Sequence, residues 1–193
     1  AMGIDDDQPL VVSYWGSLGA REMNKKIAQF FACEAADGLP FRHIHACGSF
    51  GWRWMPEYVK AQGVELTGQD KIELREFIYD MPQVMAAADL VICRAGAATI
   101  AEVAASGTPC IMVPSPNVTD NHQEKNARVL EARGAAAVLR EAQCSGQVLY
   151  ETAKSILSDP ARRRAMAMAA AQMAVVDSAE QICETALELA QTR

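Results

Sequence analysis

The chain has 193 residues, of which 18 are Lys or Arg and 24 are Asp or Glu, giving a formal net charge of −6. Half of the residues are hydrophobic and 6% are aromatic. This length fits one ordinary domain of about 100–200 residues. High apolar content with a small net charge excludes a disordered chain. The acidic balance argues against a general nucleic-acid binder, and no apolar run approaches the ~18 residues of a membrane span.

Six cysteines lie far apart and form no Cys-x-x-Cys pair. This spacing is typical of buried free thiols in a reducing compartment, so we expect a cytoplasmic protein. The chain opens on Ala1-Met2, which resembles a cloning scar more than a natural start. We therefore expect residues 1–8 to be a scar or linker. Residues 9–193 are expected to form one domain, excised from a longer protein.

Along the chain, β-prone apolar runs alternate with stretches of helical periodicity. Strands are expected at residues 9–14, 42–47, 72–78, 89–93, 109–114 and 135–139. Helices are expected at residues 20–36, 55–62, 81–88, 97–106 and 121–133, with a loop over residues 48–51 and only helices from residue 145 onward. This alternation predicts an α/β fold: a Rossmann-like, doubly wound parallel sheet with C-terminal helices.

In such a fold, ligands bind outside the carboxyl ends of the strands, where the strand order reverses. The loops over residues 15–20 and 94–99 are rich in Gly and Ala, and each precedes a predicted helix. Small residues let backbone N–H groups approach a phosphate, and the helix start adds partial positive charge. Neither loop has a GxGxxG or GxxxxGK[ST] pattern, which disfavours both a nicotinamide cofactor and a P-loop. Together the two loops could hold a diphosphate from two sides.

Glu102 follows Thr99 by three residues and matches a capping box. Its carboxylate could instead bind two adjacent ribose hydroxyls, and the spacing alone leaves both roles open. His43 and His45 alternate on a predicted strand and share a face, but no third metal ligand is evident. No catalytic Ser/His/Asp or Cys/His arrangement can be identified.

The run Asp120-Asn121-His122-Gln123 places four polar side chains at the start of a predicted helix. Pro114 and Pro116 precede it and fix a rigid, extended approach. An N-cap would explain one of the four polar residues but not the whole cluster.

In order and spacing, these stretches resemble the C-terminal half of the MurG family, bacterial N-acetylglucosaminyltransferases that make the lipid II precursor of peptidoglycan. The matches cover roughly residues 9 to 190. They are Gly16-Ser17-Leu18-Gly19-Ala20-Arg21 with Asn24, Phe77-Ile78-Tyr79-Asp80-Met81, Ala88-Asp89-Leu90-Val91-Ile92-Cys93-Arg94-Ala95-Gly96-Ala97 with Thr99 and Glu102, Gly107-Thr108-Pro109, Val113-Pro114, Asp120-Asn121-His122-Gln123 and Asn126-Ala127.

The resemblance implies the donor lobe of a two-lobed GT-B glycosyltransferase, which binds UDP-GlcNAc and needs neither a cofactor nor a metal. Ser17 and its loop would contact the diphosphate. Arg94 would add a local positive charge there, or serve a structural role. Further phosphate contacts would come from the backbone at the start of the following helix, at Gly96, Ala97, Ala98 and Thr99.

The resemblance also implies how the nucleoside and the sugar are held. Ile78 would meet the uracil through its main chain, and Glu102 would bind the ribose hydroxyls. Gln123, together with His122, would bind hydroxyls of the GlcNAc ring. The chain departs from the family where Trp15 replaces a glycine, so that the indole packs beneath the loop or narrows the cleft. It also departs where Tyr79 replaces a common Asp.

The implied reaction moves GlcNAc from UDP-GlcNAc to the lipid-linked muramyl-pentapeptide, lipid I to lipid II, with inversion. The acceptor lobe, the catalytic base and the membrane-docking surface would lie in an absent N-terminal domain. The isolated chain is then expected to be inactive, and only the full-length enzyme would sit peripherally on the cytoplasmic face of the cell membrane.

Three alternatives remain open from the sequence. The chain could be the donor lobe of another UDP-sugar GT-B enzyme, such as a natural-product glycosyltransferase or a UDP-GlcNAc 2-epimerase. It could be a separate catalytic subunit that docks on a membrane-anchored partner, as in the eukaryotic dolichol-linked transferase. The third alternative is a non-enzymatic nucleotide-binding module. No nucleic-acid partner is expected in any of these cases.

Overall fold

The computed structural model describes residues 8–66 and 71–191. Its strands form one parallel sheet in the order β3-β2-β1-β4-β5-β6. Their bounds are Leu10–Tyr14 (β1), Arg42–Ala46 (β2), Ile72–Arg75 (β3), Leu90–Cys93 (β4), Cys110–Met112 (β5) and Ala136–Val138 (β6). The predicted α/β sheet is confirmed, whereas the scar or linker expected over residues 1–8 lies outside the described residues except for its last position.

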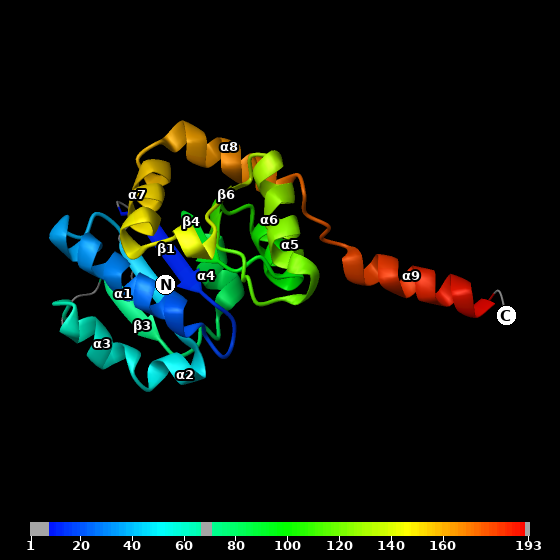
Figure 1. Ribbon diagram of the computed structural model, residues 1–193. Coiled ribbons are helices and arrows are strands. Elements are labelled where there is room, and N and C mark those ends of the chain that lie inside the picture. The colour runs from blue at the N-terminus through cyan, green and yellow to red at the C-terminus, as the bar shows by residue number, and fades with distance from the viewer. Residues whose placement is uncertain (1–7, 67–70, 192–193) are drawn as a thin grey trace.

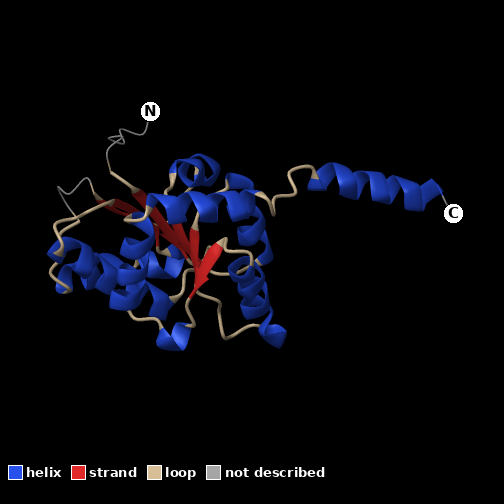
Figure 2. Ribbon diagram, turned by 90° about the horizontal axis from the view of Figure 1, so that it is seen from above, coloured by secondary structure: helices blue, strands red, loops and turns tan. Residues whose placement is uncertain are grey.

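Helices cover both faces of the sheet (Figures 1 and 2). The cluster on one face includes residues of α1, α3 and α7, and the cluster on the other includes residues of α4, α5 and α6. The helix bounds are Arg21–Ala36 (α1), Gly48–Trp52 (α2), Met55–Ala61 (α3), Met81–Ala87 (α4), Ala97–Ser106 (α5), His122–Ala132 (α6), Gly146–Leu157 (α7), Pro160–Ala171 (α8) and Ser178–Gln191 (α9), with 3₁₀ turns Thr119–Asn121 (η1) and Glu141–Gln143 (η2). Helix α9 extends away from the rest (Figure 1) and buries none of its residues.

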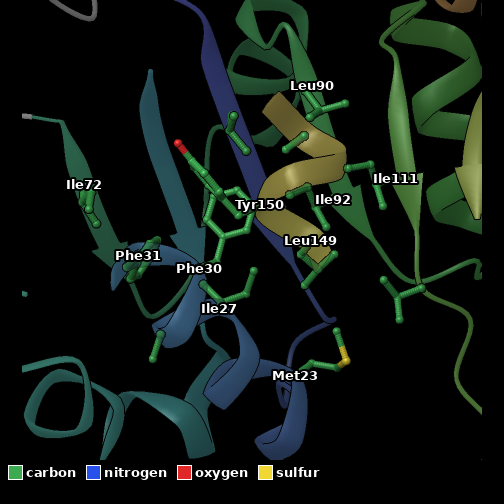
Figure 3. Packing of buried hydrophobic residues seen from close by; sticks show 14 of the residues in the cluster. Met23, Ile27, Phe30, Phe31, Ile72, Leu90, Ile92, Ile111, Leu149 and Tyr150 are labelled. Carbon is green, nitrogen blue, oxygen red and sulfur yellow. The ribbon is translucent and has the colours of Figure 1, made fainter. Parts of the chain in front are cut away.

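The strands are buried on both sides, as parallel strands between two helical layers must be. In β1, Val11 belongs to the cluster on the α1 face, while Val12 and Tyr14 belong to the cluster on the α5 face. On the α1 face, side chains of α1 such as Ile27 and Phe30 lie beside those of α7 and the sheet (Figure 3). This double burial explains why apolar runs, rather than alternating patterns, mark the strands.

The loop expected over residues 48–51 is wrong, because this segment forms the short helix α2. Its two glycines predicted a loop, yet both are required by close packing. A Cβ on Gly48 would lie 2.2 Å from the Gly19 nitrogen, and a Cβ on Gly51 would lie 2.4 Å from Asn24 Nδ2. The strand expected over residues 72–78 also ends early, at Arg75.

Helix α7 begins at a very close crossing with α1. A Cβ added at Gly146 would lie 2.4 Å from Gln29 Cβ, 2.5 Å from the Lys26 carbonyl oxygen and 2.8 Å from the Phe30 nitrogen. Two of these atoms belong to the backbone of α1, so the helices would have to separate to admit a side chain. The crossing therefore depends on a glycine at this position.

We predict that Gly146→Ala lowers the free energy of unfolding by about 2–3 kcal/mol, as overpacking in a core does. Gly134→Ala is the matched control, since Gly134 has a φ of +75° but nothing within 4 Å of an added Cβ. It should cost only about 1 kcal/mol, from backbone strain alone. Urea unfolding measures both changes, and an equal loss in the two variants would contradict a tight α1–α7 crossing.

Candidate functional site

The strand order reverses between β1 and β4, so the loops after these two strands meet at one edge of the sheet. In the first loop, Gly16 and Gly19 have φ values of 89° and 74°, and the Gly19 N–H donates to the Gly16 carbonyl at 3.0 Å. Ser17 is exposed at the tip of this turn. A Cβ on Gly19 would lie 2.0 Å from the carbonyl oxygen of Cys47, so the turn packs directly on the backbone after β2.

Trp15 packs beneath this turn and does not narrow a cleft, since only 6% of it is exposed. The Arg94 guanidinium carbon lies 5.6 Å from the centre of its ring. Arg94 Nη1 also donates to the Val113 carbonyl at 3.0 Å and pairs with Glu141 Oε2 at 2.6 Å. These contacts join four segments of the chain, and they favour the structural role of Arg94 over that of a phosphate ligand.

Helix α5 begins at the second loop with an uncapped start. Its N-cap is Gly96, in an extended conformation, and no side chain of the described residues caps the helix. Ala97 and Ala98 are exposed, so the first N–H groups are accessible. The capping role left open for Thr99 and Glu102 is excluded, because the helix starts two residues before Thr99 and both residues lie inside it.

Glu102 is exposed and lines a hollow of about 360 Å³ between α4 and α5. Met81, Pro82 and Met85 form the apolar wall of this hollow. Pro82 and Met85 were not among the site residues expected from the sequence, although a proline at a helix start directly after a strand-end loop was a usable signal. Burial raises the pKa of the Tyr14 phenol, and the nearby Cys93 and Glu102 act in the same direction.

The loop after β3 leads directly into α4, whose residues line this hollow. The Ile78 side chain is 8% exposed and belongs to the core on the α5 face. Among the described residues, none forms a hydrogen bond with its N–H or carbonyl. Ile78 can therefore offer both groups to a ligand while its side chain stays fixed. Tyr79, next in the chain, is 90% exposed.

The connection from β5 to α6 is strained where it meets the site. Asp120 and Asn121 have φ values of 55° and 51°, which non-glycine residues adopt at an energetic cost. Beyond them, His122 Nδ1 lies 2.9 Å from the Thr119 carbonyl oxygen and must donate to it. The exposed Nε2 of a neutral His122 is then an acceptor.

Gln123 has the opposite hydrogen-bonding capacity. Its Oε1 accepts from the Ser115 N–H at 2.9 Å, which leaves its Nε2 as a donor. Asn126 Nδ2 donates to the Ala95 carbonyl at 3.3 Å, tying α6 to the loop after β4. The polar cluster at the start of α6 thus presents one acceptor and one donor beside the uncapped start of α5.

A second hollow, of about 460 Å³, lies at the same edge between α1 and the loops after β5 and β6. Lys26, Glu124, Arg140 and Glu141 are among its lining residues. Arg140 and Glu141 were not among the site residues expected from the sequence, although their place directly after the last strand could have indicated them. Arg140 Nη2 pairs with Glu124 Oε1 at 2.8 Å.

His43 and His45, considered above as metal ligands, are fully buried and hydrogen-bonded within the protein. Both approach Ser13 Oγ at 2.7 Å, His43 through Nε2 and His45 through Nδ1. Across residues 8–66 and 71–191, no three His, Cys, Asp or Glu side chains gather as a metal site would require. None of the helices described there is long and apolar enough to cross a bilayer.

Comparisons with known proteins agree with this geometry. Residues 11–182 match the glycosyltransferase family 28 C-terminal domain. Two relatives carry the name UDP-N-acetylglucosamine–N-acetylmuramyl-(pentapeptide) pyrophosphoryl-undecaprenol N-acetylglucosamine transferase. The protein from Acetivibrio thermocellus is 38% identical over 95% of this chain and 48% of its own length. The protein from Listeria monocytogenes is 38% identical over 98% of this chain and 50% of its own length. The chain therefore spans about half the length of these relatives.

A solved structure gives the same result. The crystal structure of MurG from Acinetobacter baumannii superposes with a TM-score of 0.79 at 28% identity, covering 95% of this chain and 51% of that one. The GT-B lobe implied by the resemblance is thereby confirmed. The chain belongs to glycosyltransferase family 28 and comprises its C-terminal domain.

Proposed function

We propose that this domain is the donor-binding half of an inverting N-acetylglucosaminyltransferase that uses UDP-GlcNAc. One observation carries the proposal: the glycine turn over residues 16–19 and the uncapped start of α5 converge where the strand order reverses. Backbone N–H groups in such places bind phosphates, because the donors are free and the helix dipole favours negative charge. The curated relatives are named for the same transfer.

The hollow beside α5 has the chemistry of a nucleoside site. Its wall of Met81, Pro82 and Met85 is apolar, and Glu102 supplies acceptors for two vicinal hydroxyls. The free main chain of Ile78 supplies a donor and an acceptor for the edge of a base. Beyond the diphosphate, the Gln123 donor and the His122 acceptor match sugar hydroxyls.

In the transfer itself, negative charge develops on the departing diphosphate as the bond to the anomeric carbon breaks. The N–H groups of Ala97, Ala98 and Thr99 stabilise that charge from fixed positions, so no reorganisation is needed. Inversion requires in-line attack by the acceptor hydroxyl on the opposite face. We place the acceptor, its base and the contact with the cytoplasmic face of the membrane in the other half of the full-length enzyme.

Ligand selectivity tests the proposal directly. We expect UDP and UDP-GlcNAc to raise the melting temperature of the chain and ATP and NAD to leave it unchanged, because the proposed ligand is a uridine nucleotide. Differential scanning fluorimetry with the four ligands at equal concentration measures this. Equal stabilisation by ATP or NAD would reject a UDP-sugar site in favour of a general nucleotide-binding module.

The role of Glu102 predicts a defined loss of affinity. Glu102→Ala should weaken UDP binding about 10- to 100-fold, because a hydrogen bond to a charged group contributes about 1.5–3 kcal/mol. Isothermal titration with UDP and 2′-deoxy-UDP measures the effect. Wild-type protein should prefer UDP, and the variant should bind the two ligands alike.

Glu151→Ala is the control for this experiment. Glu151 is likewise exposed but lies on α7, on the opposite face of the sheet. It should retain wild-type affinity and the preference for UDP. If folded Glu102→Ala protein still discriminates between the two ligands, the ribose is bound elsewhere.

The proposed contact of Gln123 with the sugar predicts that its substitution lowers the affinity for UDP-GlcNAc more than the affinity for UDP. Gln123→Glu keeps an acceptor for the Ser115 N–H but removes the amide donor, whereas Gln123→Ala removes both. We expect Gln123→Glu to weaken UDP-GlcNAc binding about tenfold more than UDP binding, because one hydrogen-bond donor to the sugar is lost. Competition titration of the two ligands gives the ratio. An unchanged ratio in both variants would place the sugar away from α6.

A further inference from the structure

Five buried polar side chains form a continuous hydrogen-bonded chain between α1 and the sheet. Glu34 and His43 are fully buried, and His43 Nδ1 lies 3.1 Å and 3.2 Å from the two carboxyl oxygens. His43 Nε2 lies 2.7 Å from Ser13 Oγ, which in turn lies 2.7 Å from His45 Nδ1. None of these first four side chains belongs to the candidate functional site; the fifth is Asn24.

The other end of this chain reaches the candidate site. His45 Nε2 lies 3.2 Å from Asn24 Oδ1, and Asn24 Nδ2 donates to the Cys47 carbonyl at 2.8 Å. The glycine turn packs on that same carbonyl, because a Cβ at Gly19 would lie 2.0 Å from it. The chain therefore runs from beneath α1 to the loop proposed to bind the diphosphate.

The direction of the hydrogen bonds follows from the end of the chain at the Cys47 carbonyl. A carbonyl only accepts, so Asn24 must present its amide nitrogen to Cys47 and its oxygen to His45. His45 Nε2 must then carry a proton, and the Nδ1 of a neutral ring must accept from the Ser13 hydroxyl. Ser13 has one proton to give.

The same reasoning continues toward Glu34. Since Ser13 donates to His45, its oxygen accepts from His43 Nε2, and the Nδ1 of a neutral His43 is left as an acceptor. Only a protonated Glu34 can donate to it. Burial supports the three neutral forms: it lowers the pKa of His43 to about 3, lowers that of His45 well below its usual value and raises that of Glu34 well above its usual value.

We propose that Glu34 and Ser13 are positioning residues for the donor site, which hold the Cys47 carbonyl and the glycine turn through a one-directional chain of hydrogen bonds. This inference rests on the proposed function for its effect on ligand binding, but not for the direction of the chain. In the reverse direction, one contact would still find a partner. A protonated His45 Nδ1 would find the Ser13 carbonyl oxygen 3.1 Å away.

Reversal of the hydrogen-bonded chain would leave the Cys47 carbonyl without the amide donor of Asn24. If Glu34 ionised, it would accept from His43 Nδ1, and each later partner would exchange donor for acceptor. Asn24 would then turn its oxygen toward the Cys47 carbonyl, and two acceptors would face each other. The other titratable groups near Glu34 are Cys33 on α1 and Tyr150 on α7, which bonds to Asp37.

The spectroscopic test uses the imidazole ¹⁵N signals of the folded chain at neutral pH. The expected result is a bare Nδ1 and a protonated Nε2 in both His43 and His45. In Ser13→Ala, His45 should keep its proton on Nε2, because Asn24 Oδ1, oriented by the Cys47 carbonyl, still accepts from it. A neutral His43 protonated at Nδ1 in the wild-type protein would overturn the direction inferred here.

The pH test compares wild-type protein with Glu34→Gln, whose amide can donate to His43 but has no titratable proton. The pKa of Glu34 is higher in the folded protein than in the unfolded chain. Glu34 therefore stabilises the fold fully at pH values below its pKa in the unfolded chain, and this stabilisation is lost as the pH rises toward its pKa in the folded protein. From about pH 5 upward, until the pH reaches the raised pKa of Glu34, the unfolding equilibrium constant of wild-type protein should rise about tenfold per pH unit relative to the variant. The His contributions cancel in this comparison. A constant difference would mean that Glu34 is ionised in the fold, which overturns the proposal.

The positioning test compares Glu34→Leu with Glu34→Gln. We expect Glu34→Leu to weaken UDP binding about tenfold, because His43 Nδ1 is left as an unpaired buried acceptor at the end of the chain. Glu34→Gln should stay within about twofold of wild type by the same principle. Amide exchange at Gly19 should be faster in Glu34→Leu than in Glu34→Gln, a readout that needs no ligand. Wild-type protein that fails to bind UDP would refute the proposed function alone, whereas equal Gly19 exchange in the two variants would refute the positioning role.

Discussion

The close approach of two backbone segments, at the carboxyl ends of β1 and β2, is the constraint on which the site depends. Gly19 packs on the Cys47 carbonyl, and Gly48 packs on the backbone of Leu18 and Gly19. A side chain at either glycine would meet backbone atoms at about 2 Å. This contact fixes the turn that carries Ser17, and Asn24 holds it from the buried side through the same carbonyl.

The charges at this edge are arranged so that backbone dipoles, rather than side-chain cations, face the proposed diphosphate. Arg94 is occupied by Glu141, the Val113 carbonyl and the Trp15 ring. The start of α5 is uncapped and lined by alanines. Fixed N–H donors in a partly closed site stabilise developing negative charge without rearrangement. That arrangement suits the proposed leaving diphosphate, and it would let an acidic domain bind an anionic donor.

The sequence alone was sufficient for the fold, because double burial makes strands such as β4 into short apolar runs between helical periods. The sequence also located the loops after β1 and β4 and the start of α6, because each of them follows a strand. It could not show that Gly48 and Gly51 serve packing, because their neighbours come from β1 and α1. The pairing of Arg94 with Glu141 and the position of Glu34 beneath His43 were equally hidden, since these contacts join distant segments.

Amide chemical-shift mapping with UDP tests the central claim, that the reversal point of this sheet is a donor site, most directly. The account predicts that UDP shifts the amides of residues 16–19, 78 and 97–99, while those of α7 and α8, away from this edge, stay unchanged. It further predicts that UDP-GlcNAc adds shifts at residues 122 and 123. Shifts confined to other surfaces, or the same pattern produced by ADP, would contradict it.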